Sequence, residues 1–138
     1  MASNMKPKLL IAEDHPAMRA MVTSLLQRDF DVLAIVANGE AAVEAANNLL
    51  PDVLVLDVSM PILNGTDAAK RLKLEGSKAK IVFLSVSSDV DQVTACFAAG
   101  GVAYVSKTRM DVDLVYAITE VLAGREFVSP GAGRNCSG

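Results

Sequence analysis

Residues 51–65 have the sequence PDVLVLDVSMPILNG, and this stretch decides the fold. Its apolar run at 53–56 is too short for a helix and rich in β-branched residues, which predicts a strand buried on both faces. Asp57 ends that strand, so it should lie at the carboxyl edge of a parallel sheet, where open α/β sheets bind ligands. Met60-Pro61 and Asn64-Gly65 then predict a turn before the next helix.

The same alternation of short apolar runs and helical segments extends in both directions from this stretch. Further strands are predicted at 9–12, 32–36, 81–84 and 102–105, and helices at about 16–26, 40–49, 66–74, 89–99 and 111–123. Five strands that alternate with five helices predict an α/β fold with a doubly wound parallel sheet. Right-handed crossovers would place helices on both faces of that sheet.

The first predicted helix follows Pro16, which suits a first helical turn because its missing N–H bonds nothing there. Met18, Met21 and Val22 begin an apolar stripe that continues to Leu26 with helical spacing. We therefore expect both methionines to face the core.

Composition limits the class of protein. The chain has 138 residues, of which 51% are hydrophobic, and a mean hydropathy of +0.34, which fits one folded domain and excludes a disordered protein. Its net charge is −3 and its pI about 5.1, so no basic footprint for nucleic acid is present. No apolar run approaches the roughly 18 residues that span a bilayer, so no membrane partner is expected.

The two cysteines, Cys96 and Cys136, form neither a disulfide framework nor a metal-binding pattern, which favours a cytoplasmic location. Residues 1–7 have no signal-peptide character and are expected to be a leader. Residues 8–124 are expected to form the domain. Residues 125–138 hold Gly, Pro and Ser with little to bury, so they are interpreted as a tail or linker stub.

Polar side chains follow four of the predicted strands directly. Because all strands of a parallel sheet end at one edge, the following residues are expected to meet there: Glu13, Asp14, Asp57, Ser85 and Lys107. Three neighbouring carboxylates repel one another and favour a bound cation, and oxygen-only ligands suit Mg²⁺. A lysine and a hydroxyl could contact an anionic oxygen. The set predicts a site where an aspartate receives a phosphoryl group.

These residues resemble the receiver domain of two-component response regulators. The resemblance covers about residues 8–124 and includes Met60-Pro61, Gly65 and Tyr104 beside the five residues above. The segments EDHP at 13–16 and LAGREFVSP at 122–130 are most similar to receivers of the NarL/FixJ (LuxR-type) subfamily. The resemblance implies a flavodoxin-like (CheY-like) sheet with strand order 2-1-3-4-5.

The resemblance also implies a role for each residue. Asp57 would accept a phosphoryl group from the phosphohistidine of a sensor histidine kinase or phosphotransfer protein. Mg²⁺ would be held by Glu13, Asp14, Asp57 and the backbone carbonyl of Ser59, while Lys107 and Ser85 would bind the phosphoryl oxygens. Ser85 and Tyr104 would then switch the surface of the fourth helix, fifth strand and fifth helix, where a homodimer could also form on phosphorylation. Such a protein catalyses its own phosphotransfer and dephosphorylation without being an enzyme.

Some residues depart from the family pattern. Val86 follows Ser85 where a small residue is usual, and its side chain could narrow access to the site. Thr108 follows Lys107 where proline is commonest, which leaves the isomer of that peptide bond open. Ser59 and Ser87, near the entrance, are expected with Val86 to tune the rates.

Several alternatives were weighed. A haloacid dehalogenase-type phosphatase needs an acidic residue where Ser59 stands, and a flavin module needs a hydroxyl-rich loop where the chain has EDHP. A cobalamin module needs an Asp-x-His-x-x-Gly motif that does not follow the strand. A receiver-like interaction module that ignores phosphate stays open because of Val86. In the NarL/FixJ subfamily the output is transcription through a helix-turn-helix domain; about fourteen residues after Gly124 cannot form one, so this chain alone is not expected to bind DNA.

Overall fold

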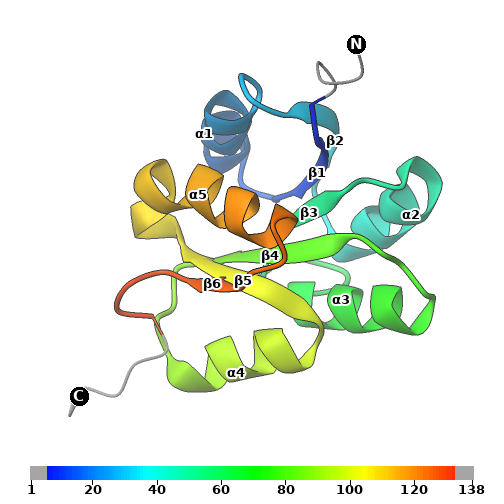
Figure 1. Cartoon of the computed structure of the whole chain (residues 1–138). Helices are drawn as coiled ribbons and strands as arrows, with labels where there is room; N and C mark the ends of the chain where they lie inside the picture. The colour runs from blue at the N-terminus through cyan, green and yellow to red at the C-terminus, as the bar shows by residue number, and fades with distance from the viewer. Residues whose placement is uncertain (1–5, 133–138) are drawn as a thin grey trace.

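The computed structural model describes residues 6–132 and contains one parallel sheet between two layers of helices (Figure 1). The elements in chain order are β1 (Lys8–Ala12), α1 (Pro16–Leu26), β2 (Asp31–Val36), α2 (Gly39–Leu49), β3 (Val53–Asp57), α3 (Gly65–Leu74), β4 (Lys80–Ser85), α4 (Val90–Ala98), β5 (Gly101–Ser106), the short 3-10 helix η2 (Lys107–Arg109), α5 (Met110–Leu122) and β6 (Phe127–Val128). The strand order is β2-β1-β3-β4-β5-β6. The predicted order 2-1-3-4-5 and the five α-helices are confirmed.

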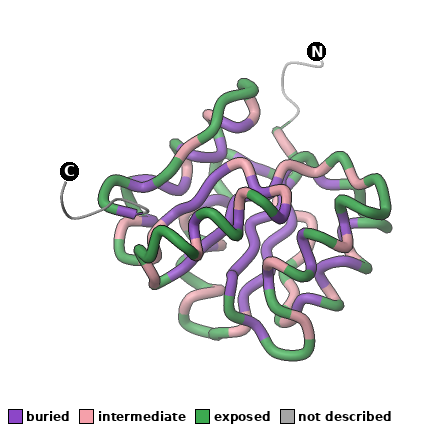
Figure 2. The backbone as a smooth tube through the Cα atoms, turned by 90° about the horizontal axis from the view of Figure 1, so that it is seen from below, coloured by how far each residue is buried: buried purple, intermediate pink, exposed green. Residues whose placement is uncertain are grey.

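The central strands are buried on both faces, as the apolar run at 53–56 predicted. Val53 and Val55 pack with α1 and α5, whereas Leu54 and Leu56 pack with α2, α3 and α4. Because side chains alternate between the two faces of a strand, one short apolar run contributes side chains to the hydrophobic cores on both sides of the sheet. Figure 2 shows the buried strands passing through the middle of the molecule, with exposed residues on loops and outer helix faces.

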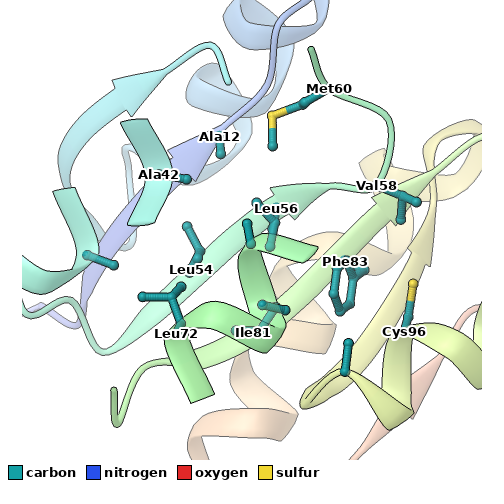
Figure 3. Close-up of a cluster of buried hydrophobic side chains, with 14 of the residues drawn as sticks. Ala12, Ala42, Leu54, Leu56, Val58, Met60, Leu72, Ile81, Phe83 and Cys96 are labelled. Atoms are coloured by element: carbon teal, nitrogen blue, oxygen red, sulfur yellow. The ribbon is translucent and has the colours of Figure 1, made fainter. Parts of the chain in front are cut away.

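Figure 3 shows the core on the side of α2, α3 and α4, where Phe83 and Cys96 lie among aliphatic side chains. Burial raises the pKa of the Cys96 thiol to about 12, so the thiol stays protonated. Cys136 lies outside the described residues. The prediction for Met21 was wrong. Its side chain is 52% exposed, because the stripe facing the sheet is centred on Val22 and Leu26, both fully buried.

The segment after α5 differs from the expectation of a tail that buries little. β6 pairs in parallel with β5, with Phe127 beside Ala103 and Val128 beside Tyr104. Ser129 and Ala132 are 1% and 4% exposed. The segment therefore extends the sheet by one short strand and covers the β5 edge. Among residues 6–132, no helix has the length and apolar character needed to cross a membrane.

Candidate functional site

The acidic cluster, formed by Glu13, Asp14 and Asp57, lies at the carboxyl edge of the sheet. One carboxylate oxygen from each residue lies within 4.8 Å of the others. Glu13 and Asp14 follow β1 and Asp57 ends β3, and these two strands are neighbours. Glu13 and Asp57 are 0% and 3% exposed. The sequence prediction that these carboxylates meet is thus confirmed.

Lys107 connects two members of the acidic cluster. Its Nζ lies 2.9 Å from Oε1 of Glu13 and 3.0 Å from Oδ2 of Asp57. The ammonium is nearly buried, because only 9% of the side chain is exposed. Three carboxylates and one ammonium leave the site with two excess negative charges when all four groups are ionised. Such a site favours a cation.

Burial and charge shift the pKa of these groups. Burial raises the pKa of Asp57 to about 6, and the charge of Glu13 adds to this, while the hydrogen bond and charge of Lys107 oppose it. Burial alone would lower the pKa of Lys107, but its bonds to Glu13 and Asp57 raise it above its ordinary value. Lys107 is therefore charged at neutral pH.

The backbone at the end of β1 is fixed by Arg19, which the sequence analysis did not single out. Nη1 of Arg19 donates to the carbonyls of Glu13 and Asp14 at 3.2 and 3.1 Å. The N–H of His15 donates to Oε2 of Glu13 at 3.1 Å. Arg19 lies one turn into α1. The spacing from Glu13-Asp14 to a cation in the next helix was the only sequence signal for this contact.

The loop after Asp57 is folded tightly against the end of β3. The N–H of Ser59 donates to Oδ1 of Asp57 at 3.2 Å, and the N–H of Gly65 donates to the carbonyl of Val58 at 2.8 Å. A Cβ at position 65 would collide with the backbone oxygen of Asp57. The Asn64-Gly65 turn signal therefore reflects a close approach of two backbones.

Ser85 and Tyr104 are both buried, and both contact Gln92 of α4. The Ser85 hydroxyl donates to Oε1 of Gln92 at 2.5 Å, and the Tyr104 hydroxyl lies 2.9 Å from the same oxygen. The Tyr104 hydroxyl also donates to the carbonyl of Ser87 at 2.6 Å. Ser85, Ser87 and Tyr104 are predictable from the sequence, but Gln92 is not, because a lone glutamine in a helix carries no signal.

The residues that depart from the family pattern lie at the surface. Val86 is 78% exposed, so its side chain does not pack among the carboxylates. The Lys107–Thr108 peptide bond is trans. A hollow of about 740 Å³ beside the acidic cluster is lined in part by Asp14, Ser59 and Gln92. The hollow therefore lies between the loops after β1 and β3 and the helix α4.

The comparisons with known proteins agree with this geometry. A family model described as response regulator receiver domain matches residues 9–119. The chain belongs to this family. This receiver is thus a signalling domain of a two-component system rather than a classical enzyme.

Relatives and solved structures also support the predicted subfamily. The chain is 32% identical over 130 residues to the nitrate/nitrite response regulator protein NarL of Escherichia coli K12, covering 92% of this chain and 60% of that protein. It is 32% identical over 126 residues to the response regulator GacA of Pseudomonas syringae, with coverages of 89% and 58%. The chain therefore spans about six tenths of these curated relatives. A LuxR-family response regulator structure from Aurantimonas sp. SI85-9A1 matches with a TM-score of 0.86, 28% identity and 91% coverage of both chains.

Proposed function

We propose that this receiver accepts a phosphoryl group on Asp57 from the phosphohistidine of its sensor kinase or of a phosphotransfer protein. The observation that carries the proposal is the acidic cluster with Lys107 bound to both Glu13 and Asp57. An ammonium held between two carboxylates can contact a phosphoryl oxygen without losing its partners. The carboxylate edge of the sheet thus combines a nucleophile with a fixed positive charge.

The acidic cluster fits a Mg²⁺ ion. Oε1 of Glu13 is buried and, among residues 6–132, has no hydrogen-bond donor in good geometry, although the Lys107 ammonium lies beside it. A buried carboxylate oxygen with spare capacity is suited to a hard cation. Glu13, Asp14 and Asp57 would hold the ion together with the backbone carbonyl of Ser59. When bound, Mg²⁺ offsets the excess negative charge and that of the phosphoryl group.

The chemistry at Asp57 is a substitution at phosphorus. A carboxylate oxygen of Asp57 forms the new P–O bond while the P–N bond of the phosphohistidine breaks, and the electron pair stays on the imidazole nitrogen. Lys107 and the Ser85 hydroxyl would donate to the phosphoryl oxygens as charge develops there. Ser59, Val86 and Ser87 would set the rates of phosphorylation and hydrolysis.

The proposed response is a rearrangement of Ser85 and Tyr104 that alters the surface formed by α4, β5 and α5. That surface would control an output. We propose that the output is transcription through a helix-turn-helix domain, because the relatives are longer than this chain. Homodimerisation on phosphorylation would use the same surface. The exposed position of Val86 supports this function over a module that ignores phosphate, because the side chain leaves the carboxylates accessible.

The test is phosphorylation by acetyl phosphate, followed by intact mass. With Mg²⁺ the chain should gain the mass of one phosphoryl group, and it should gain none without Mg²⁺. The Asp57→Ala variant should stay unmodified, and Asp52→Ala, which changes an exposed aspartate at the opposite end of β3, should behave as the wild type. A gain that persists in Asp57→Ala would place the phosphoacceptor elsewhere. No gain in any protein would favour the phosphate-independent module.

A further inference from the structure

Oε1 of Gln92 lies within hydrogen-bond distance of the two hydroxyl groups proposed to form the switch. This oxygen lies 2.5 Å from Oγ of Ser85 and 2.9 Å from the hydroxyl of Tyr104. The backbone of Ser87 closes the arrangement, because its N–H donates to Oγ of Ser85 at 3.0 Å and its carbonyl accepts from Tyr104 at 2.6 Å. We call these four residues the Gln92 network.

The Gln92 atom that faces Ser85 is the amide oxygen, Oε1. A separation of 2.5 Å is within the range of an O–H···O bond but shorter than N–H···O bonds, which begin at about 2.7 Å. Ser85 has a single hydroxyl proton, and its oxygen already accepts the N–H of Ser87. The Ser85 proton is therefore directed to Gln92.

While the Ser85 hydroxyl donates its proton to Gln92, it cannot also donate that proton to a phosphoryl oxygen. A hydroxyl can bind a phosphoryl oxygen only by donating its proton, and Ser85 has one proton to donate. In the geometry described, Ser85 must release Gln92 before it can bind a group on Asp57. Gln92 therefore competes with the phosphoryl group for the same proton.

We infer that Gln92 is a positioning residue that stabilises the unphosphorylated state by accepting the Ser85 proton beside the Tyr104 hydroxyl. The inference rests on the proposed function of Asp57 and Ser85. When the Ser85 hydroxyl donates to a phosphoryl oxygen instead, Oε1 of Gln92 keeps only the Tyr104 hydroxyl as a neighbouring donor. Because Gln92 belongs to α4 and Tyr104 to β5, this exchange connects the phosphoryl site to the α4–β5 surface.

The first test measures the affinity for beryllofluoride, a phosphoryl mimic, in the presence of Mg²⁺. The variant Gln92→Met keeps the length of the side chain and removes the acceptor. It should bind beryllofluoride about two- to tenfold more tightly than the wild type, which is the factor that one neutral hydrogen bond corresponds to. The matched control is Thr94→Val, which changes an exposed residue of the same helix and should leave the affinity unchanged.

A double-mutant cycle separates proton competition from a general effect on α4. In the Ser85→Ala background no Ser85 proton exists, so Gln92→Met should no longer change the affinity. A second readout uses Tyr116→Phe, in which Tyr104 is the only tyrosine of a chain without tryptophan. In that background Gln92→Met should shift the near-ultraviolet band of Tyr104 before beryllofluoride is added.

The outcomes are distinct. If the wild type binds beryllofluoride and Gln92→Met binds it equally or more weakly, the role inferred for Gln92 is refuted. The function proposed for Asp57 is not affected by that result. Tighter binding that persists in the Ser85→Ala background also overturns competition for the Ser85 proton. If the wild type neither binds beryllofluoride nor gains phosphate, both the proposed function and this inference fail.

Discussion

The surroundings of Asp57 disfavour the ionised form of its carboxyl group. The carboxyl group is 3% exposed and has Glu13 as a neighbour, and burial raises its pKa to about 6. Lys107 offsets only part of this effect. A buried carboxylate next to a second buried carboxylate therefore lowers the stability of the cation-free domain.

Asp57→Asn should stabilise the Mg²⁺-free protein at neutral pH. The folded pKa of about 6 exceeds the ordinary 3.8, so between these values the folded state binds more protons than the unfolded state, and stability falls as pH rises. The difference in the free energy of unfolding should reach up to about 3 kcal/mol above pH 6 and vanish below about pH 4. Urea unfolding from pH 4 to 7.5 measures it. A constant difference across this range would contradict the assignment to Asp57.

Lys107→Met should destabilise the protein, because it leaves two buried carboxylates without their cationic partner. Loss of one member of a buried ion pair costs about 3–5 kcal/mol. Mg²⁺ should restore part of this loss by binding the folded state, and should raise the melting temperature of the variant more than that of the wild type. Thermal unfolding with and without Mg²⁺ measures both effects. Lys70→Met, at an exposed site on α3, should differ little from the wild type with either buffer.

The site residues differ in how far sequence could predict them. Glu13, Asp57 and Lys107 were predictable because each follows a strand and so lies at a known edge of the sheet. Arg19 and Gln92 were not, because they act from helices, where the contacting atom depends on helix rotation and side-chain conformation. The residues that could not be predicted, Arg19 and Gln92, are therefore those that hydrogen-bond to the predicted site residues or their backbone.

At the level of elements, β6 is attached to the domain mainly through Ser129. Its N–H donates to the carbonyl of Tyr104 at 2.9 Å, and its hydroxyl donates to Oδ2 of Asp113 in α5 at 2.7 Å. The same hydroxyl accepts the N–H of Ser106 at 3.0 Å. Asp113 is also bound by Arg109 at 2.8 Å. One serine thus joins β5, β6 and α5.

Ser129→Ala should lower the free energy of unfolding by about 1–3 kcal/mol, since it leaves buried Asp113 with one donor fewer and the N–H of Ser106 without this acceptor. Chemical denaturation measures the loss. Ser24→Ala, at an exposed position of α1, should change stability by less than about 0.5 kcal/mol. A Ser129→Ala protein as stable as this control would show that β6 adds no stability.

β6 is not predictable from the sequence, for a physical reason. Phe127 and Val128 form a strand of two residues, too short for a periodic pattern. The strand exists because the β5 edge offers backbone partners and because Ser129 meets Asp113, which is 16 residues earlier in the chain. Such contacts depend on the assembled fold and not on local sequence.

For the whole molecule, the strands and helices could be predicted because each buried strand is a short apolar run and each helix has its own signals for its start and end. Asn38, Asn64 and Asp89 each cap a helix with a side-chain oxygen. The topology came from the family resemblance, since periodicity does not give strand order. Met21 shows where helical periodicity fails as a predictor of burial. The apolar stripe of a helix can be wider than the part of the helix surface that packs against the sheet.

Residues 125–132 pass from one side of the sheet to the other. Phe127 packs on the α5 side of the sheet and Ala132 belongs to the core on the α4 side, so the segment crosses the β5 edge between them. If residues 125–132 were not packed on the domain, the tether to a following segment would begin at Gly124. Because they are packed, the tether begins after Ala132, eight residues later. A shorter tether raises the effective concentration of whatever it carries at the nearby α4–β5–α5 surface. For a domain joined after Ala132, the anchor at Ser129 would therefore shorten the tether and raise the local concentration of that domain.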